Sequence, residues 1–261
     1  MDPTTKDIMR SLDRITTHRR RSKVFDDWLE LVDAYLRMLP AHAESIATNG
    51  RPADDDDEAK ELWKRLLERE RYDADDMKHF AQACTALLVG SHAGNGAPDY
   101  KDVLGYLYME WSHPNSHTGQ YFTPFEICRM MANVTTHDLM DQLRERIVAA
   151  IGVDWSELGF DPMKPHTLEW IATKHLPARI ERFDPITVQD PCVGSGGMLL
   201  AVAAALPAWV VRTGLVRFYG QDIDHSCVLM ARINMKLYGL NGYGLRVSMA
   251  GAALAAAGGR G

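Results

Sequence analysis

The sequence has no continuous apolar run long enough to cross a membrane, and it has no closely spaced cysteine pair. A membrane-spanning helix needs about 20 consecutive apolar residues, and neither such a run nor the apolar core of a secretion signal occurs in the 261 residues. The four cysteines, at positions 84, 128, 192 and 227, are widely scattered. We therefore expect reduced thiols, no metal site, no membrane contact and a cytoplasmic protein.

An excess of positive charge is also missing. The chain has 29 Lys and Arg residues against 35 Asp and Glu residues, which gives a net charge of -6. Since nucleic-acid binding depends on cations that neutralise phosphates, this balance argues against a free-standing DNA-binding protein. Any contact with DNA is expected from a partner or from the local basic cluster of Arg19, Arg20, Arg21 and Lys23.

Residues 1–115 are predicted to form a helical domain. Residues 23–39 place apolar side chains at helical spacing, and Pro40 is predicted to end that helix. The acidic run at 54–57 is predicted to begin a second helix, because carboxylates stabilise the positive end of a helix dipole. A third helix is expected over residues 77–90.

The pattern changes near residue 183 to alternating strands and helices. Residues 186–188 form a short β-prone run followed by a glycine-rich turn and an apolar helix, and residues 216–222 begin a second strand-then-helix unit. Residues 245–249 could form a third strand. This order predicts an α/β fold with a parallel sheet.

The glycine turn and the acid after the second strand together indicate a nucleoside site. Glycines let the backbone approach a ligand closely, and a helix N-terminus offers free N–H groups. Asp222 ends the second strand, where open α/β sheets use a carboxylate to bind ribose hydroxyls. Leu199 stands where a dinucleotide fingerprint would have its third glycine, so S-adenosylmethionine is favoured over a nicotinamide cofactor.

Three motifs carry a resemblance to a known family. They are TGQYFTP at 118–124, DPCVGSGGML at 190–199 and GQDIDHSCVLMARINMKLYGL at 220–240. Together they resemble the adenine-N6 DNA methyltransferases, in particular the modification subunits of type I restriction-modification systems. The resemblance extends over roughly residues 117 to 240.

The resemblance implies a Rossmann-like sheet, S-adenosylmethionine as cofactor, and DNA as a partner. It also implies a specificity subunit or a complementing methylase subunit as a possible second partner. Ile223 would pack on the adenine ring and Asp222 would bind the ribose. The cofactor-binding residues that it implies are Gln120, Tyr121, Phe122, Thr123, Asp190, Gly194, Ser195, Gly196, Asp222 and Ile223.

Two family features have no counterpart in this sequence. The family builds its base-binding site from an Asn or Asp, two prolines and an aromatic residue, but no Pro-Pro pair occurs here, and the acid expected after the third strand is not evident. Catalytic residues are therefore left unassigned, and methylation by this chain alone is not expected. The alternatives are a non-catalytic cofactor-binding or assembly subunit and, more distantly, a nicotinamide-dependent enzyme.

The expected organisation is a helical domain over 1–115, an incomplete Rossmann-like cofactor-binding domain over 116–250, and an Ala- and Gly-rich tail over 251–261. A sheet of about three strands would leave an unpaired edge. We expect either a partner that completes the sheet or a truncated gene product.

Overall fold

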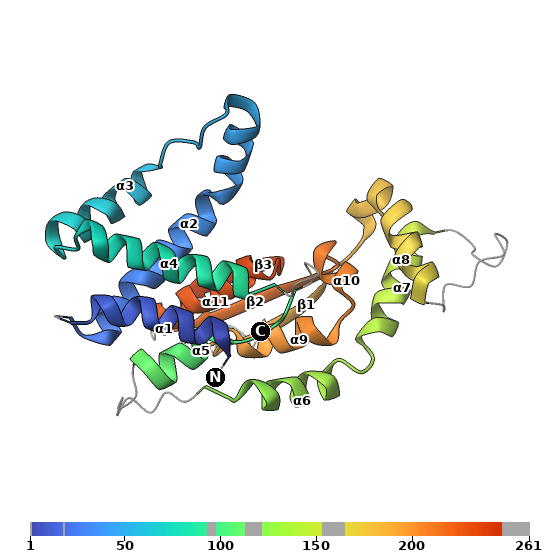
Figure 1. Ribbon diagram of the computed structural model, residues 1–261. Coiled ribbons are helices and arrows are strands. Elements are labelled where there is room, and N and C mark those ends of the chain that lie inside the picture. The colour runs from blue at the N-terminus through green and yellow to red at the C-terminus, as the bar shows by residue number, and fades with distance from the viewer. Residues whose placement is uncertain (1, 18, 93–97, 113–121, 153–164, 247–261) are drawn as a thin grey trace, which may run out of the picture.

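The computed structural model describes residues 2–17, 19–92, 98–112, 122–152 and 165–246. It is mainly helical and contains a small parallel sheet. Figure 1 shows the sheet near the centre, with the N-terminal helices on one side and α7 and α8 on the other. The α-helices are α1 (Pro3–Ile15), α2 (Arg21–Asn49), α3 (Asp57–Lys64), α4 (Ala74–Gly90), α5 (Val103–Leu107), α6 (Phe125–Thr135), α7 (Leu139–Ile151), α8 (Pro165–Lys174), α9 (Gly197–Ala205), α10 (Ala208–Arg212) and α11 (His225–Leu237).

Three helical segments of other types and three strands complete the described elements. The π-helical turns η1 and η2 extend α3 and α5, and the 3₁₀ segment η3 precedes the first strand. The bounds are η1 (Arg65–Arg69), η2 (Tyr108–Ser112), η3 (Pro177–Arg182), β1 (Ile186–Asp190), β2 (Val216–Asp222) and β3 (Gly242–Arg246).

The sheet has the strand order β1-β2-β3, and both pairings are parallel. Asp190 at the end of β1 lies opposite Gly220 in β2, and Asp222 at the end of β2 lies opposite Arg246 in β3. The carboxyl ends of the strands therefore meet at one edge of the sheet. Helices α9 and α10 connect β1 to β2, and α11 connects β2 to β3.

Three predicted boundaries are wrong. Helix α4 begins at Ala74 rather than at residue 77, because the Asp73 side chain caps it there. Helix α2 does not end before Pro40 but continues to Asn49, with Pro40 inside it. Pro40 has no N–H to donate to the Leu36 carbonyl, so the helix continues there with one backbone hydrogen bond fewer. Strand β3 begins at Gly242 rather than at 245, because pairing with β2 sets its start. Residues 247–249 of the predicted strand lie outside the described residues.

The acidic run does begin a helix, as predicted. The Asp56 carboxylate caps α3 by accepting a hydrogen bond from the Ala59 backbone N–H at 2.8 Å. Asp57 and Glu58 occupy the first turn, where the helix dipole favours negative charge.

The N-terminal helices and the sheet share one apolar core. Phe25 and Trp28 of α2, Trp111 of η2 and Ile233 of α11 are all fully buried members of one continuous cluster. Helix α2 also packs along α11. At this junction the buried Asp33 of α2 forms ion pairs with two cations of α11, Arg232 at 2.7 Å and Lys236 at 2.8 Å.

Candidate functional site

A pocket of about 250 Å³ lies beside the glycine turn between β1 and α9. One wall comes from the turn and the end of β1, and the other comes from the segment that leads into α6 and from α6 itself. The lining residues are Phe122, Thr123, Cys128, Asp190, Cys192, Val193, Gly194, Ser195, Gly197 and Met198. The described end of the TGQYFTP segment, from Phe122 onward, and the glycine turn are about 70 positions apart in the sequence, and they meet at one site.

The turn needs glycine at two positions. Gly194 has φ +52° and Gly196 has φ +91°, in the left-handed region that other residues rarely adopt. A Cβ on Gly194 would lie 3.1 Å from the Phe122 ring, and one on Gly196 would lie 3.3 Å from the Ala231 Cα. The turn is therefore packed tightly against the segment before α6 on one side and against α11 on the other.

Two aspartates end neighbouring strands at this edge. Asp190 Oδ1 accepts a hydrogen bond from the Cys192 N–H at 3.0 Å. Asp222 accepts from the Gly194 N–H at Oδ2 and from the Asp224 N–H at Oδ1, both at 3.0 Å. A carboxylate oxygen has two lone pairs, so each Asp222 oxygen can accept one further hydrogen bond from a ligand.

Ile223 follows Asp222 and leaves 53% of its surface exposed. An exposed large apolar side chain directly beside a partly free carboxylate suits a ligand with an apolar ring and adjacent hydroxyls. The Asp224 side chain has a structural role. It caps α11 by accepting hydrogen bonds from the Ser226 and Cys227 N–H groups.

Behind the turn lies a buried polar network that the sequence did not predict. The Ser195 hydroxyl, in a residue only 2% exposed, donates to Asp102 Oδ2 at 2.5 Å. Asn234 donates to the Ser195 carbonyl at 2.8 Å. Burial raises the pKa of the Asp102 carboxyl above its ordinary value, although the hydrogen bonds from Ser195, Gly105 and Asn234 oppose the shift.

The structure brings most of the predicted cofactor residues together. Phe122, Thr123, Asp190, Gly194 and Ser195 line one pocket. Asp222 is joined to the turn by its hydrogen bond from Gly194, and Ile223 follows it in the chain. Gly196 packs against Ala231 and shapes the turn without lining the pocket. Gln120 and Tyr121 lie outside the described residues.

Asp102 and Asn234 were missed because no local pattern marks them as part of the site. Asp102 caps α5, which a helix-start rule can predict, but its second contact is 93 positions away in the chain. Gly105, three residues later, belongs to the same contact in the folded chain. A Cβ at that glycine would lie 2.6 Å from the Ser195 Oγ, so the position requires close approach of two segments.

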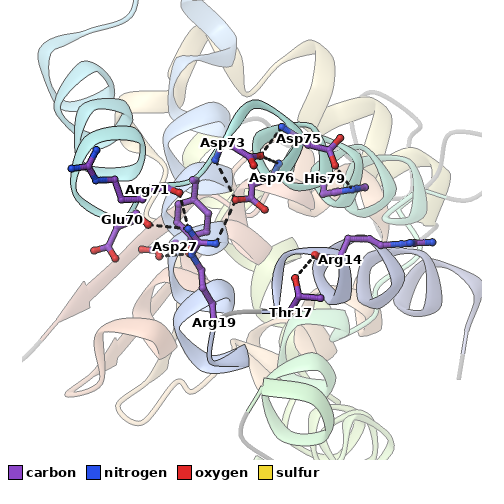
Figure 2. Close-up of polar contacts among 11 residues, drawn as sticks. Arg14, Thr17, Arg19, Asp27, Glu70, Arg71, Asp73, Asp75, Asp76 and His79 are labelled. Atoms are coloured by element: carbon purple, nitrogen blue, oxygen red, sulfur yellow. Dashed lines mark hydrogen bonds and ion pairs between the residues drawn. The ribbon is translucent and has the colours of Figure 1, made fainter.

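The predicted basic cluster is mostly engaged within the protein. Arg19 donates to the Glu70 and Arg71 carbonyls at 3.0 and 2.8 Å, as Figure 2 shows, and its guanidinium lies over the Tyr72 ring. Arg21 pairs with Asp13 at 3.1 Å, and Lys23 pairs with the buried Asp27 at 2.8 Å and with Glu70 at 3.0 Å. Arg20 is exposed. Arg21 is exposed as well, although it is paired with Asp13, and contact of this cluster with DNA stays a prediction.

A second, larger hollow of about 520 Å³ lies between α2, α3, η1 and α11. Its walls mix both charge signs, and several of these charges pair across it, such as Arg65 with Glu30 at 2.7 Å and Arg232 with Asp33 at 2.7 Å. These pairs balance much of its charge, so the wall does not form a surface of one sign. The smaller pocket at the glycine turn is the better candidate, because it lies where the strands end.

Two further features are absent from the described ranges. No helix there is both long and apolar enough to span a bilayer. Nor do three His, Cys, Asp or Glu side chains of the described residues gather closely enough to hold a metal ion.

A glycine turn with two aspartates at the carboxyl edge of a parallel sheet is the place where open α/β sheets bind their ligands. Residues 172–255, which contain this turn and both aspartates, match the family model of the N-6 DNA Methylases. The predicted resemblance to that methyltransferase family is thus confirmed for this part of the chain. A comparison with curated protein sequences gives no match.

Among solved structures, the chain is similar to the methyltransferase subunit of a type I restriction-modification system from Streptococcus thermophilus. The two share 15% sequence identity, and the TM-score is 0.42. The alignment covers 94% of this chain and 58% of that subunit. So low a TM-score does not establish a common fold, and the family match is the finding that bears on function.

Proposed function

We propose that the pocket at the glycine turn binds S-adenosylmethionine and that the chain acts in adenine-N6 methylation of DNA. The observation that carries the proposal is the meeting of Phe122, Gly194 and Asp190 at one pocket, with Asp222 bonded to the same turn. The match of residues 172–255 to the N-6 DNA Methylase family supports it. A Rossmann-like sheet, of which the three parallel strands would be one part, belongs to the same proposal.

The residues present fit this cofactor. Asp222 has acceptor capacity for ribose hydroxyls, and the exposed Ile223 offers an apolar surface for the adenine ring. The pocket volume of about 250 Å³ is smaller than most ligand pockets. It suits the amino-acid part of the cofactor, and the nucleoside would lie outside this pocket, against Asp222 and Ile223.

When bound, S-adenosylmethionine supplies an activated methyl group. The chain's own contribution is to position the cofactor and to exclude water from one side of it. Phe122 would form the wall beside the turn, since its ring already lies against Gly194 and contacts the ring of Tyr108 at a centroid distance of 5.1 Å.

DNA is the proposed substrate, and a specificity subunit or a complementing methylase subunit is the proposed partner. A target adenine must leave the base stack before its amino group can be reached. The family's Asn/Asp-Pro-Pro-aromatic motif, which holds such a base, is not found in the sequence. The second candidate function is therefore cofactor binding without methyl transfer, within an assembly.

A calorimetric titration of S-adenosylmethionine tests the proposal. We expect the wild-type protein to bind and Asp222→Ala to bind roughly 10 to 150 times more weakly, since hydrogen bonds to a charged group contribute about 1.5–3 kcal/mol. Asp184→Ala is the matched control. Asp184 is an exposed aspartate before β1, at the opposite end of the strands. Equal affinity in all three folded proteins would remove Asp222 from the site, and no wild-type binding would refute the cofactor proposal.

Transfer of labelled methyl groups to DNA separates the two candidate functions. Binding without label in the DNA supports the non-catalytic reading. Labelled adenine produced by the protein alone would show that a base-binding site exists that the sequence motif did not reveal.

A further inference from the structure

Asp102 begins α5 in the N-terminal half of the chain, yet it also contacts the glycine turn. Its Oδ1 accepts from the Gly105 N–H at 2.9 Å, which is an ordinary N-terminal cap. Its Oδ2 accepts from the Ser195 hydroxyl at 2.5 Å. One carboxylate therefore serves a helix start and the proposed cofactor turn at the same time.

Asn234 of α11 closes this arrangement. Its side-chain amide donates to the Ser195 carbonyl at 2.8 Å and to Asp102 Oδ1 at 3.4 Å. Asn234 and Ser195 are 1% and 2% exposed, so these hydrogen bonds are shielded from water. Three separate segments are thus tied together at a single residue of the turn.

The packing leaves no room for other side chains at this contact. A Cβ at Gly105 would lie 2.3 Å from Asp102 Oδ2, and one at Gly197 would lie 3.2 Å from the same oxygen. Both glycines therefore let the helix start and the turn approach until the carboxylate reaches Ser195.

The same turn that Asp102 contacts also binds Asp222, the predicted ribose-binding acid. Ser195 directly follows Gly194, whose N–H donates to Asp222 Oδ2 at 3.0 Å. We propose that Asp102 is a positioning residue for S-adenosylmethionine binding, which holds Ser195 and thereby fixes Gly194 and the Asp222 carboxylate. This inference rests on the proposed function and adds to it a residue from outside the α/β segment.

The competing explanation is that Asp102 serves only as a helix cap. Asp73 provides the matched control, because it caps α4 by accepting from the Asp75 and Asp76 N–H groups at 2.9 Å and makes no described contact with the turn. Asp73→Ala therefore removes a cap of the same kind at a distance from the site.

The test combines hydrogen exchange of the Gly194 amide with calorimetric titration of S-adenosylmethionine, on the full chain. In Asp102→Ala we expect the Gly194 amide to exchange at least about tenfold faster and the cofactor to bind at least about tenfold more weakly, the effect of losing one buried hydrogen bond. Asp73→Ala should change neither value. Asp102→Asn should restore affinity to within about threefold of wild type, because its side chain still bonds Ser195.

Unchanged exchange and unchanged affinity in folded Asp102→Ala would overturn the inference, and so would equal effects of Asp102→Ala and Asp73→Ala. Should Asp102→Ala fail to fold, Ser195→Ala removes the same hydrogen bond from the other side, and the same increase in Gly194 exchange is expected. The exchange measurement needs no ligand. Absence of cofactor binding by the wild-type protein would therefore refute the proposed function, while exchange would still decide whether Asp102 fixes the turn.

Discussion

Replacement of Gly194 by alanine tests the shape of the pocket directly. Gly194 has φ +52°, and a left-handed conformation costs other residues roughly 1–2 kcal/mol. The alanine also restricts the unfolded chain, which offsets about 0.4–1 kcal/mol. Strain alone therefore lowers the free energy of unfolding by about 1 kcal/mol.

The added methyl group also meets the Phe122 ring at 3.1 Å. The ring must move by a few tenths of an ångström, although it also packs against the ring of Tyr108. Inserting a methyl group into a packed site costs about 1–3 kcal/mol, and this partly open site belongs at the lower end. We therefore expect Gly194→Ala to be about 2 kcal/mol less stable than wild type and to bind S-adenosylmethionine at least about tenfold more weakly.

Gly152→Ala is the control for strain alone. Gly152 has φ +65° at the end of α7, and a Cβ there would have no neighbour within 4 Å. Urea unfolding followed by circular dichroism should show a loss of about 1 kcal/mol for this variant, and calorimetry should show unchanged affinity. Equal losses of stability in the two variants, or wild-type affinity in Gly194→Ala, would refute the packing of Phe122 against the turn.

Three further predictions concern other groups. At pH 8, thiol alkylation should modify the exposed Cys192 first, and bound cofactor should slow the alkylation of Cys192. Cys84 should react slowly, because burial raises the pKa of its thiol to about 11. Mass spectrometry that finds no protection of Cys192 by the cofactor would count against the pocket. The pKa of Asp102 is raised in the folded state, so the folded protein should lose stability relative to Asp102→Asn as the pH rises from 3.8, the ordinary pKa, through the higher pKa of the folded state. A difference in unfolding free energy between the two proteins that stays constant with pH, measured by urea unfolding, would contradict the raised pKa. Asp33→Ala leaves two cations of α11 without their partner and should lower stability by about 1–3 kcal/mol, so an unchanged unfolding midpoint would show that the pair contributes nothing.

Local sequence patterns were sufficient for the parts of the fold that depend on neighbouring residues. The strand ending at Asp190, the glycine turn and the strand ending at Asp222 all lie where β-prone runs, glycines and the following apolar helices indicate them. Asp56 begins α3 as its position in the acidic run predicts. In these segments the residues of a short stretch of chain are enough to determine its secondary structure.

The errors lie where distant contacts or solvent decide the outcome. Helix α2 continues past Pro40 although this residue cannot donate a backbone hydrogen bond, and strand β3 starts where β2 pairs with it. The cations Arg19 and Lys23 find partners in the segment around Glu70, roughly 50 positions away, which no sequence window reveals. For the same reason, the link from Asp102 to Ser195 was visible only in the fold.

A crystal structure of the protein with S-adenosylhomocysteine, the product form of the cofactor, would show whether the glycine turn holds the cofactor. We predict ribose hydroxyls at the Asp222 carboxylate, the adenine ring against Ile223, and the amino-acid part beside Gly194 and Phe122. Ligand in the charged hollow between α2 and α11 instead, or a glycine turn left empty at saturating ligand, would contradict the account.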